Sequence, residues 1–373
     1  MRPAGGVWVV DGHGYGHGRG MSQWGARAAA AKGLSAARIL SFYYPRTTGR
    51  RVGNPVIRIK VGGDPSLVVL PAAGQRITWR GRQVAMPASR GVLRWQVGAW
   101  GHGLRLRYRT ATAWTWWGTA LPAEVAVRSS RSTLRVIRRD GTSTAYRGIL
   151  IVVRSGSAAI VVNQVRLDTY LRGVVPRESP AYWPLQALRA QAVAARTYAY
   201  RALRSPRSRY YHICDTTSCQ VYGGAARYGR DGRRLYGEEP STDRAVASTA
   251  GVVLMVGGRA ATTEYSASHG GWIAYGGTST LPGRRDPYRA ADPYMYWRAR
   301  VRVVEVGRRL GFSRLDKLQV LRRDGQGEWG GRVLQVRLTG LDGAGRPAAR
   351  TVSGALLRSA LGVRSTYFRL RAG

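Results

Sequence analysis

Short runs of β-branched and other apolar residues, often alternating with polar ones, make up most of the chain between residues 54 and 166. Gly, Pro and Asp separate these runs, and such residues favour turns. The pattern predicts an antiparallel sheet or a barrel-like module. Its predicted strands are VIRIKV (56–61), SLVVL (66–70), LRWQV (93–97), LRLRY (104–108), LRVI (134–137) and ILIVV (149–153).

Apolar residues at helical spacing dominate the segment from about Pro184 to Leu203 and predict one long helix. Pro180 and Pro184 stand before or within its first turn, where a missing amide donor costs least. Arg189 and Arg196 are seven residues apart, and we expect both on a face away from the buried stripe. The residues expected in that stripe are Leu185, Leu188, Ala192, Ala195 and Ala199.

The rest of the chain adds a helix and several strands to this picture. A second helical pattern follows a Gly/His loop (12–25), with Ala26 as its first apolar position, and ends at Pro45. The later elements are expected to be GVVLMV (251–256), TTEYSASHGG (262–271), RVLQVRL (332–338), a short helix near 353–361 and STYFRL (365–370). We therefore expect an α+β fold, with β-rich sheets or a barrel-like module around one long central helix.

The composition predicts a folded, strongly basic protein. Of its 373 residues 44% are hydrophobic, including 12 Trp and 20 Tyr, which excludes disorder as the dominant state. Sixty Lys and Arg against 19 Asp and Glu give a net charge of +41, which attracts polyanions. Because zinc-finger spacing and aromatic RNA-recognition motifs are missing, nucleic acid is an unlikely partner. No apolar run is long enough to predict a membrane span.

Glu178 is the first candidate for acid–base chemistry. It lies in a Pro-flanked segment, expected to be a loop, immediately before the predicted long helix. Acidic residues are scarce in this chain, so a carboxylate beside a helix start and near Arg189 and Arg196 is notable. The alternative is an ordinary loop glutamate that stabilises the N-terminus of the helix.

Four segments of the chain resemble the SpoIID/LytB family of peptidoglycan-acting proteins. They are VVPRESPAYWPLQALRAQAVAARTYAY (174–200), CDTTSCQVYGG (214–224), AVASTAGVVLMVGGRAATTEYSASHGG (245–271) and GHGYGHGRGMSQWGARAAAAKGLSAARILSFYYPRT (12–47). The resemblance implies a lytic transglycosylase that cuts peptide-stripped glycan strands and leaves 1,6-anhydro-MurNAc ends. It also implies that Glu178 is the catalytic acid and base, and that Arg189 and Arg196 occupy the basic helix positions of the family.

A single carboxyl suffices for that reaction, because the muramyl 6-hydroxyl is the nucleophile and the paired carboxylates of ordinary glycosidases are unnecessary. No cofactor is then required. The partners expected are peptidoglycan glycan strands and anionic wall polymers. The alternative, similar to LytB-type members, is a non-catalytic protein that binds the cell wall and stimulates an amidase.

The Gly/His loop GHGYGHGRGMSQWG (12–25) is expected to bind substrate. Its glycines give backbone amides access to a ligand, and His13, His17, Ser22 and Gln23 carry groups suited to sugar hydroxyls and acetamides. The alternative is a structural turn in which Ser22 or Gln23 caps the next helix. Ser268 and His269 form a similar polar end of a predicted strand. His269 is expected either to line a groove that binds the glycan or to make a local hydrogen bond.

Two further features each leave two alternatives. Cys214 and Cys219, the only cysteines, form either a small-loop disulfide, which an extracytoplasmic protein favours, or a zinc site together with His212. Trp114, Trp116 and Trp117 either stack on sugars or pack in the core.

In better-known family members the Gly/His segment follows the rest of the domain, whereas here it leads. We interpret this order as a circular permutation and expect Asp11–Gln23 to pack beside the C-terminal strand. The expected organisation is residues 1–48 completing the SpoIID-like domain, a β-rich subdomain at 49–150, and the main region at 151–373. The protein is expected to be secreted or associated with the cell wall. Its N-terminal residues lack the pattern of a secretion signal, which a longer gene product or a removed signal would each explain.

Overall fold

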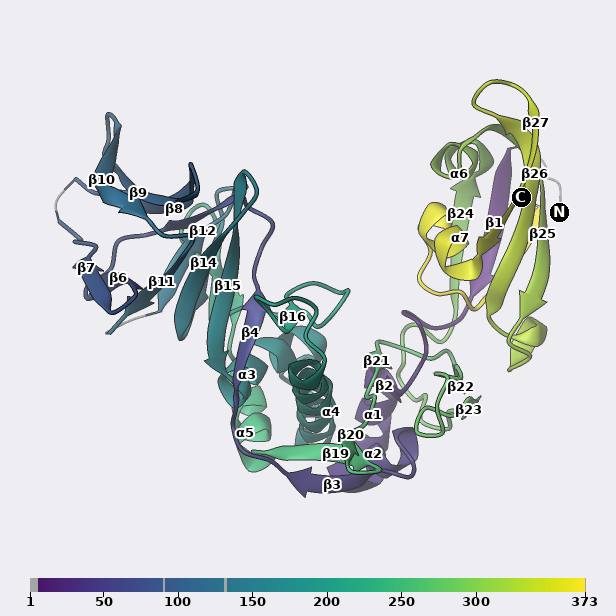
Figure 1. Cartoon of the computed structure of the whole chain (residues 1–373). Coiled ribbons are helices and arrows are strands. Elements are labelled where there is room, and N and C mark those ends of the chain that lie inside the picture. Colours follow the sequence, from purple (N-terminus) through teal and green to yellow (C-terminus); the bar gives the residue numbers. More distant parts are fainter. Residues whose placement is uncertain (1–5, 90, 131–132, 373) are drawn as a thin grey trace. The chain divides into compact units, whose positions relative to one another are not determined.

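The computed structural model describes residues 6–89, 91–130 and 133–372 and divides into two compact units (Figure 1). One unit comprises residues 48–261, and the other combines the residues up to 47 with those from 262 onward. The boundary expected after residue 150 falls inside strand β14 (Ile149–Ser155), which pairs with strands from both sides of it. The structure therefore groups the chain differently from the three segments expected.

The 48–261 unit contains two large sheets that contact each other. The first has the order β16 (Ile213–Cys214), β4 (Val56–Lys60), β15 (Ala158–Arg166), β14, β11 (Glu124–Ser129), β6 (Gln75–Trp79) and β7 (Arg82–Ala85). The second has the order β10 (Trp114–Leu121), β9 (Gly103–Arg109), β8 (Arg94–Trp100), β5 (Ser66–Val69), β12 (Leu134–Ile137), β13 (Ser143–Tyr146), β17 (Ala226–Tyr228) and β18 (Arg234–Gly237).

Alternating side chains explain why these strands pack as they do. In β4, Ile57 and Ile59 are fully buried while the residues between and beside them are partly exposed, as the period of a strand requires. Strand β8 contacts β14 and β15 of the other sheet, so the apolar faces meet. Neither sheet closes on itself in the described ranges. The fold is thus the predicted β-rich α+β fold, with open sheets in place of a barrel.

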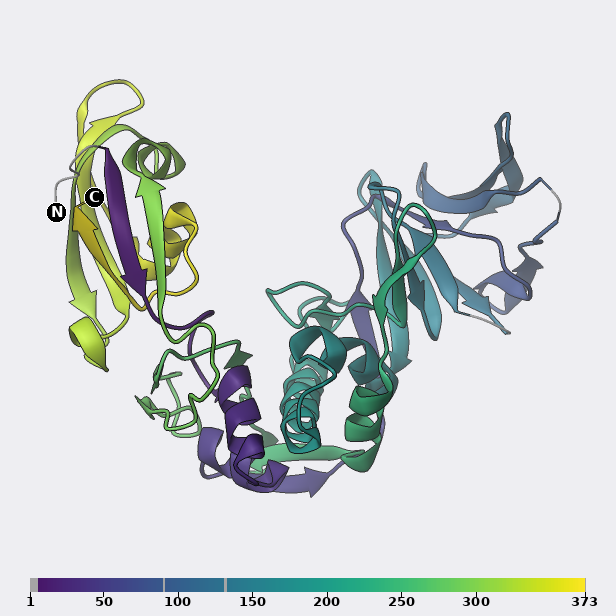
Figure 2. The same cartoon turned by 180° about the vertical axis from the view of Figure 1, so that it is seen from behind.

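Three helices of this unit lie side by side in Figures 1 and 2: α3 (Leu167–Glu178), α4 (Leu185–Arg204) and α5 (Pro240–Ser248). Helix α4 confirms the predicted long helix. Four of the five residues expected in its buried stripe are fully buried, but Leu185 is 38% exposed because it lies in the first turn, at the end of the helix. The helices also border a small sheet of β20 (Arg259–Ala260), β19 (Val252–Val256) and β3 (Thr48–Arg51).

Helix α3 corrects the expectation of a loop around Glu178, which is its last residue. The helix forms despite Pro176 because one face is apolar and buried. That face consists of Leu167, Tyr170, Leu171, Val174 and Val175.

In the other unit, two three-stranded sheets and the helices α6 (Val303–Arg309) and α7 (Gly354–Leu361) surround one apolar core. The strands are β24 (Trp297–Arg302), β1 (Val7–Gly12) and β28 (Phe368–Ala372) in one sheet, and β25 (Phe312–Arg323), β26 (Val333–Asp342) and β27 (Pro347–Ser353) in the other. The short 3₁₀ helix η1 (Glu328–Gly330) belongs to the same unit. Helix α7 confirms the short helix predicted near 353–361.

Strand β1 pairs antiparallel with the C-terminal strand β28, with Asp11 opposite Arg369 and Gly12 opposite Phe368. The backbone N–H of His13 continues this pairing by donating to Tyr367 O at 2.8 Å. The expected packing beside the C-terminal strand is therefore confirmed for Asp11–His13, whereas Met21–Ser22 at the other end of the Asp11–Gln23 segment pairs with Tyr265–Ser266. The circular permutation itself stays a prediction.

The second helical pattern forms two helices where one was predicted. They are α1 (Gln23–Ala31) and α2 (Ala36–Tyr43). Gly33 separates them because its φ of +84° is not helical, and Ser35 then caps α2 by accepting from Arg38 N. The expected strand at 262–271 is reduced to β21 (Tyr265–Ser266), which pairs with β2 (Met21–Ser22). A further short pair is β22 (Trp272–Ile273) with β23 (Arg284–Arg285).

Candidate functional site

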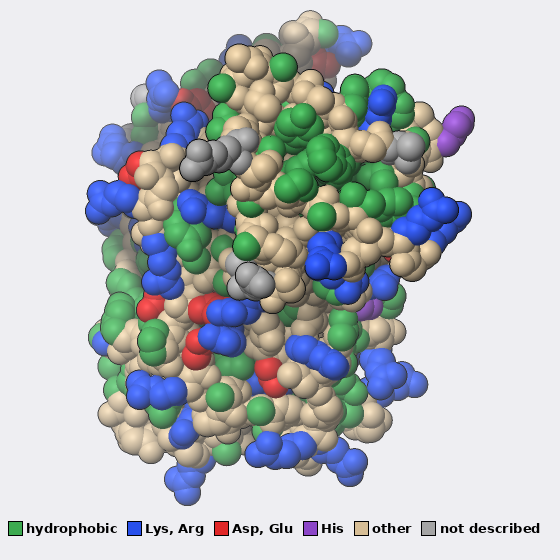
Figure 3. Space-filling view, turned by 90° about the vertical axis from the view of Figure 1, so that its left-hand side faces the viewer, with side chains coloured by type: hydrophobic (Ala, Val, Ile, Leu, Met, Phe, Trp, Pro, Cys, Tyr) green, Lys and Arg blue, Asp and Glu red, His purple; other side chains and the backbone are tan. Residues whose placement is uncertain are grey.

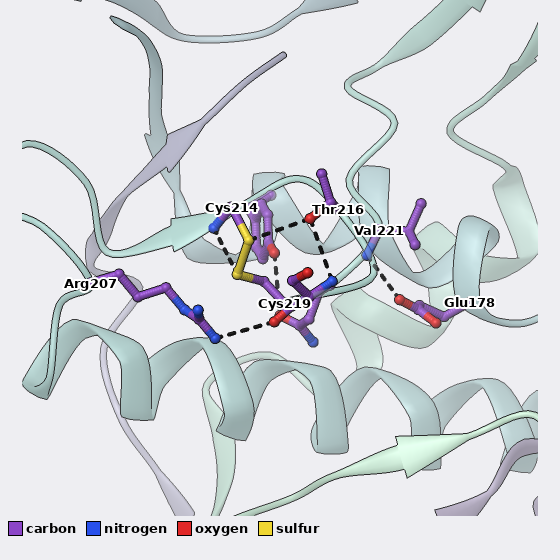
Figure 4. The surroundings of a disulfide bond; sticks show 9 residues. Glu178, Arg207, Cys214, Thr216, Cys219 and Val221 are labelled. Atoms are coloured by element: carbon purple, nitrogen blue, oxygen red, sulfur yellow. Dashed lines mark hydrogen bonds between the residues drawn. A yellow bond between two sulfur atoms is a disulfide. The ribbon is translucent and has the colours of Figure 1, made fainter. Parts of the chain in front are cut away.

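Glu178 is held in place by a segment far along the chain. Its Oε1 accepts a hydrogen bond from the backbone N–H of Val221 at 3.0 Å, and Figure 4 shows the two residues facing each other. The side chain is only partly exposed. The carboxylate thus sits at the end of α3 with a defined orientation, which is what a group that transfers protons to a bound substrate requires.

The segment that carries Val221 begins with a disulfide between Cys214 and Cys219 (Figure 4). Within the small loop, Cys219 N donates to Thr216 O at 2.9 Å. The structure therefore contains the disulfide alternative. The zinc alternative requires two thiolates, which a disulfide does not provide. The Nδ1 of His212, the third ligand of that alternative, accepts from Arg58 N at 2.9 Å.

Gln220 ties the same segment to two helices. Its buried side chain accepts from Tyr170 of α3 at 3.2 Å and donates to Ala195 O of α4 at 3.2 Å. Residues 214–221 are consequently fixed at one end by a covalent bond and at the other by buried hydrogen bonds. The position of the Val221 N–H relative to Glu178 follows from both.

Arg196 is fully buried, which corrects the expectation that it lies on an outer face of the helix. Its Nε donates to Asp168 of α3 at 2.8 Å, and its other nitrogens donate to Val246 O and to Thr249 Oγ1. Burial lowers the pKa of Arg196 and the Asp168 carboxylate opposes this effect. In this position the guanidinium links α4 to α3 and α5, and it contacts protein groups rather than solvent.

Arg189 remains partly exposed and donates to Ser248 Oγ of α5 at 3.0 Å. Arg177, adjacent to Glu178, was not among the sequence candidates. It is exposed and stacks its guanidinium 3.7 Å from the ring centroid of Tyr236. Of the basic residues considered, Arg189 and Arg177 have the exposure that contact with a substrate requires.

In the other unit, the Gly/His loop packs against residues 265–269. Tyr15 N donates to Ser268 O at 2.9 Å, and Gly18 N donates to Ser266 Oγ at 3.2 Å. Ser22 accepts from Gly25 N at 3.0 Å and caps α1, so the capping alternative holds for Ser22. Gln23, the first residue of α1, is buried. The structure thus unites the Gly/His loop with the Ser268–His269 segment. That the loop binds substrate stays a prediction.

The two histidines of the loop have different surroundings. His13 is buried, its Nδ1 lies 2.5 Å from Met295 O, and its Nε2 lies 3.4 Å from a carboxylate oxygen of Glu328. The Nδ1 of His17 accepts from Arg19 N at 3.0 Å. Burial, aided by the positive charge of Arg19, lowers the pKa of His17 to about 3. His17 is therefore neutral at physiological pH and presents a hydrogen-bonding ring rather than a cation.

Ser268 and His269 are both buried and bonded within their own unit. Ser268 Oγ donates to Asp292 at 2.5 Å, and His269 Nδ1 lies 3.2 Å from Asp286. Tyr43 donates to the same Asp286 carboxylate at 2.9 Å. For His269 the local hydrogen bond, one of its two alternatives, is present. Asp286 and Asp292 were not predicted as partners, because each lies in a loop distant from the motif.

Comparison with known proteins places the Glu178 region in context. The family model described as "Stage II sporulation protein" (SpoIID) matches residues 155–256, which include α3, the disulfide and α4. An "Amidase enhancer" of Bacillus subtilis (strain 168) is 36% identical over 130 residues, covering 34% of this chain and 16% of that protein. An uncharacterized protein of Brachyspira hyodysenteriae is 35% identical over 127 residues, covering 34% of this chain and 32% of that protein. The chain thus spans less than a third of the length of either relative. No helix in the described part of the chain is long and apolar enough to cross a membrane.

Proposed function

We propose, on the premise that residues 155–256 match the SpoIID family, that this protein is a lytic transglycosylase of peptidoglycan with Glu178 as its acid and base. The observation that supports the assignment most is the position of Glu178. It is a partly exposed carboxylate at the end of a family helix, oriented by the Val221 N–H. Peptide-stripped glycan strands are the proposed substrate, and wall association outside the cytoplasm is the proposed location, in agreement with the disulfide.

In the proposed mechanism, Glu178 first donates its proton to the glycosidic oxygen between MurNAc and GlcNAc, and the bond from C1 of MurNAc to that oxygen breaks. The 6-hydroxyl of the same MurNAc then attacks C1, and its proton passes to the Glu178 carboxylate. The products are a 1,6-anhydro-MurNAc end and a free GlcNAc hydroxyl, and no water is consumed. Because the substrate supplies the nucleophile, one enzyme carboxyl serves both steps.

The arginines have different roles in this proposal. Arg177, adjacent to Glu178 at the end of α3, and Arg189, partly exposed on α4, are proposed to hold substrate oxygens. Arg196 is proposed as a positioning residue, since its buried guanidinium fixes α4 against the helix that ends in Glu178.

A second candidate is a non-catalytic wall-binding protein that stimulates an amidase. The similarity to the amidase enhancer of Bacillus subtilis favours it. The two functions differ in their need for the Glu178 carboxyl, because binding alone does not require proton transfer.

The Glu178→Gln variant separates the two candidates, with Glu124→Gln as a matched control on an exposed residue of β11 in the same unit. We expect Glu178→Gln to abolish release of soluble glycan fragments while sedimentation with purified walls is unchanged, and Glu124→Gln to behave as the wild type. Undiminished release by Glu178→Gln would reject the catalytic assignment. If the wild type and both variants release nothing but stimulate a wall amidase equally, the second candidate is the correct one.

A further inference from the structure

Three tryptophans are exposed on one outer face of the eight-stranded sheet. Trp100 of β8 is 50% exposed, and Trp114 and Trp116 of β10 are 37% and 40% exposed. Trp114 and Trp116 share a face because they are two residues apart in a strand, whereas Trp117, also 37% exposed, lies on the opposite face and contacts the buried Trp95 edge-on at 5.5 Å. Trp114, Trp116 and Trp117 are each at least 37% exposed, so packing in the core does not account for the cluster, and the outer face needs a functional explanation.

Two arginines of β9, the strand between β8 and β10, lie among these rings. The guanidinium of Arg105 lies 4.9 Å from the ring centroid of Trp100 and 4.2 Å from that of Trp116. The guanidinium of Arg107 lies 4.4 Å from Trp114 and 5.4 Å from Trp116. These five residues form a ladder of alternating rings and cations, which we call the Trp/Arg ladder.

The strand register extends the ladder into a groove. Arg107 is directly opposite Gln96 on β8 and Trp116 on β10. Arg107 Nε donates to Gln96 Oε1 at 2.7 Å, and Gln96 donates in turn to Ser66 Oγ at 2.7 Å. The groove has a volume of about 340 Å³. It is lined by Pro65, Ser66, Gln96, Gly98, Ala99, Trp100, Arg105, Arg107, Trp116 and Ser157, none of which is acidic.

The two ladder cations are not neutralised. Within residues 6–89, 91–130 and 133–372, neither Arg105 nor Arg107 forms an ion pair, whereas Arg147 in the same unit is paired with Glu238 at 2.8 Å. Arg and Trp side chains carry hydrogen-bond donors and no acceptors. A surface made of them is therefore complementary to a ligand that offers acceptors and negative charge. In Figure 3, which views the side of the molecule where β7, β9 and β10 lie in Figure 1, hydrophobic side chains gather among basic ones.

We propose that the Trp/Arg ladder and its groove bind an anionic cell-wall glycopolymer, a sugar chain that carries phosphodiester groups. The guanidinium groups pair with the phosphates, and the indole rings offer apolar surface to the sugars. Single-stranded nucleic acid offers the same phosphodiester charge, but the disulfide and the proposed cell-wall function favour a wall polymer as the ligand. The inference rests on the proposed cell-wall function and specifies where the wall polymer is held.

The test measures binding of an isolated poly(GlcNAc 1-phosphate) glycopolymer, which contains no MurNAc–GlcNAc bond, by quenching of Trp fluorescence at physiological ionic strength. The key variant is Arg105→Gln/Arg107→Gln. The matched control is Arg76→Gln/Arg128→Gln, a cross-strand pair of exposed arginines on the other sheet with the same change in charge. We expect the ladder variant to weaken binding about tenfold or more and the control less than about twofold. Arg105→Lys/Arg107→Lys keeps the charge but loses the planar fork, so we expect it to weaken binding as well.

Equal losses in the ladder and control variants would overturn the proposal, because they would show that net charge alone holds the polymer. Tighter binding of oligo(dT) than of the glycopolymer at the ladder would also overturn it and indicate a nucleic-acid surface. Because the probe has no bond for Glu178 to cut, the Glu178→Gln variant should bind it like the wild type. A failure of the catalytic assignment is thereby distinguished from a failure of the ladder proposal.

Discussion

The backbone N–H of Val221 donates to Glu178 Oε1 at 3.0 Å, across a separation of 43 residues. Val221 follows the second cysteine of the disulfide by two residues, and Gln220 between them is bonded to α3 and α4. The Cys214–Cys219 disulfide therefore helps to orient the proposed catalytic carboxyl of Glu178, through Gln220 and Val221. This connection makes the disulfide relevant to function as well as to stability.

Removal of the disulfide in a Cys214→Ser/Cys219→Ser variant should lower both stability and activity. Closing a loop of this size stabilises a protein by about 2 kcal/mol through the unfolded state. Because the loop positions the Val221 N–H, we also expect glycan release to fall while the affinity for walls changes little. Urea unfolding and a release assay measure the two effects. Full activity in a destabilised variant would show that the loop does not control Glu178.

Arg196→Ala should destabilise the protein much more than Arg189→Ala. Truncation of Arg196 leaves Asp168 without its buried partner and removes hydrogen bonds to Val246 O and Thr249, a loss of about 3–5 kcal/mol. Arg189 is partly exposed with one hydrogen bond to a serine, so its truncation should cost about 1 kcal/mol or less. Chemical denaturation compares the two. Similar losses would contradict a structural role specific to Arg196.

Stability should depend on pH through His17. Its pKa of about 3 in the folded protein lies below the ordinary value of 6.5, so between these values the unfolded chain binds a proton that the folded chain does not. Stability contributed by neutral His17 is therefore present above pH 6.5 and is lost as the pH falls toward 3. Unfolding free energies measured from pH 7 to pH 4 should fall less steeply for His17→Asn, which keeps a hydrogen-bond acceptor but does not titrate. An equal pH dependence of the unfolding free energy in the wild type and in His17→Asn would contradict the lowered pKa of His17.

The features that the sequence predicted well depend on local periodicity. The spacing of Leu188, Ala192, Ala195 and Ala199 identified α4, and the apolar runs identified six of the fifteen strands described in the two large sheets, namely β4, β5, β8, β9, β12 and β14. Helix α3 was missed because Gly173 and Pro176 indicate a loop, although the residues from Leu167 to Val175 carry a helical apolar stripe that was available as a signal.

The features that the sequence did not predict depend on contacts between distant residues. The hydrogen-bond partner of Glu178 is a backbone amide, and a backbone hydrogen bond does not require a particular residue type. The burial of Arg196 depends on Asp168, 28 residues earlier, and on the α5 carbonyl of Val246. The Trp/Arg ladder depends on the register of three strands, which decides whether Arg107 meets Trp116 or turns to the opposite face.

The most direct test of the central claim is mass spectrometry of the ends of glycan fragments released from peptide-stripped strands. Intramolecular attack by the muramyl 6-hydroxyl predicts 1,6-anhydro-MurNAc ends, which are one water lighter than ordinary reducing ends, and predicts their disappearance with Glu178→Gln. Reducing ends produced by the wild-type protein, or anhydro ends produced equally by Glu178→Gln, would contradict the account.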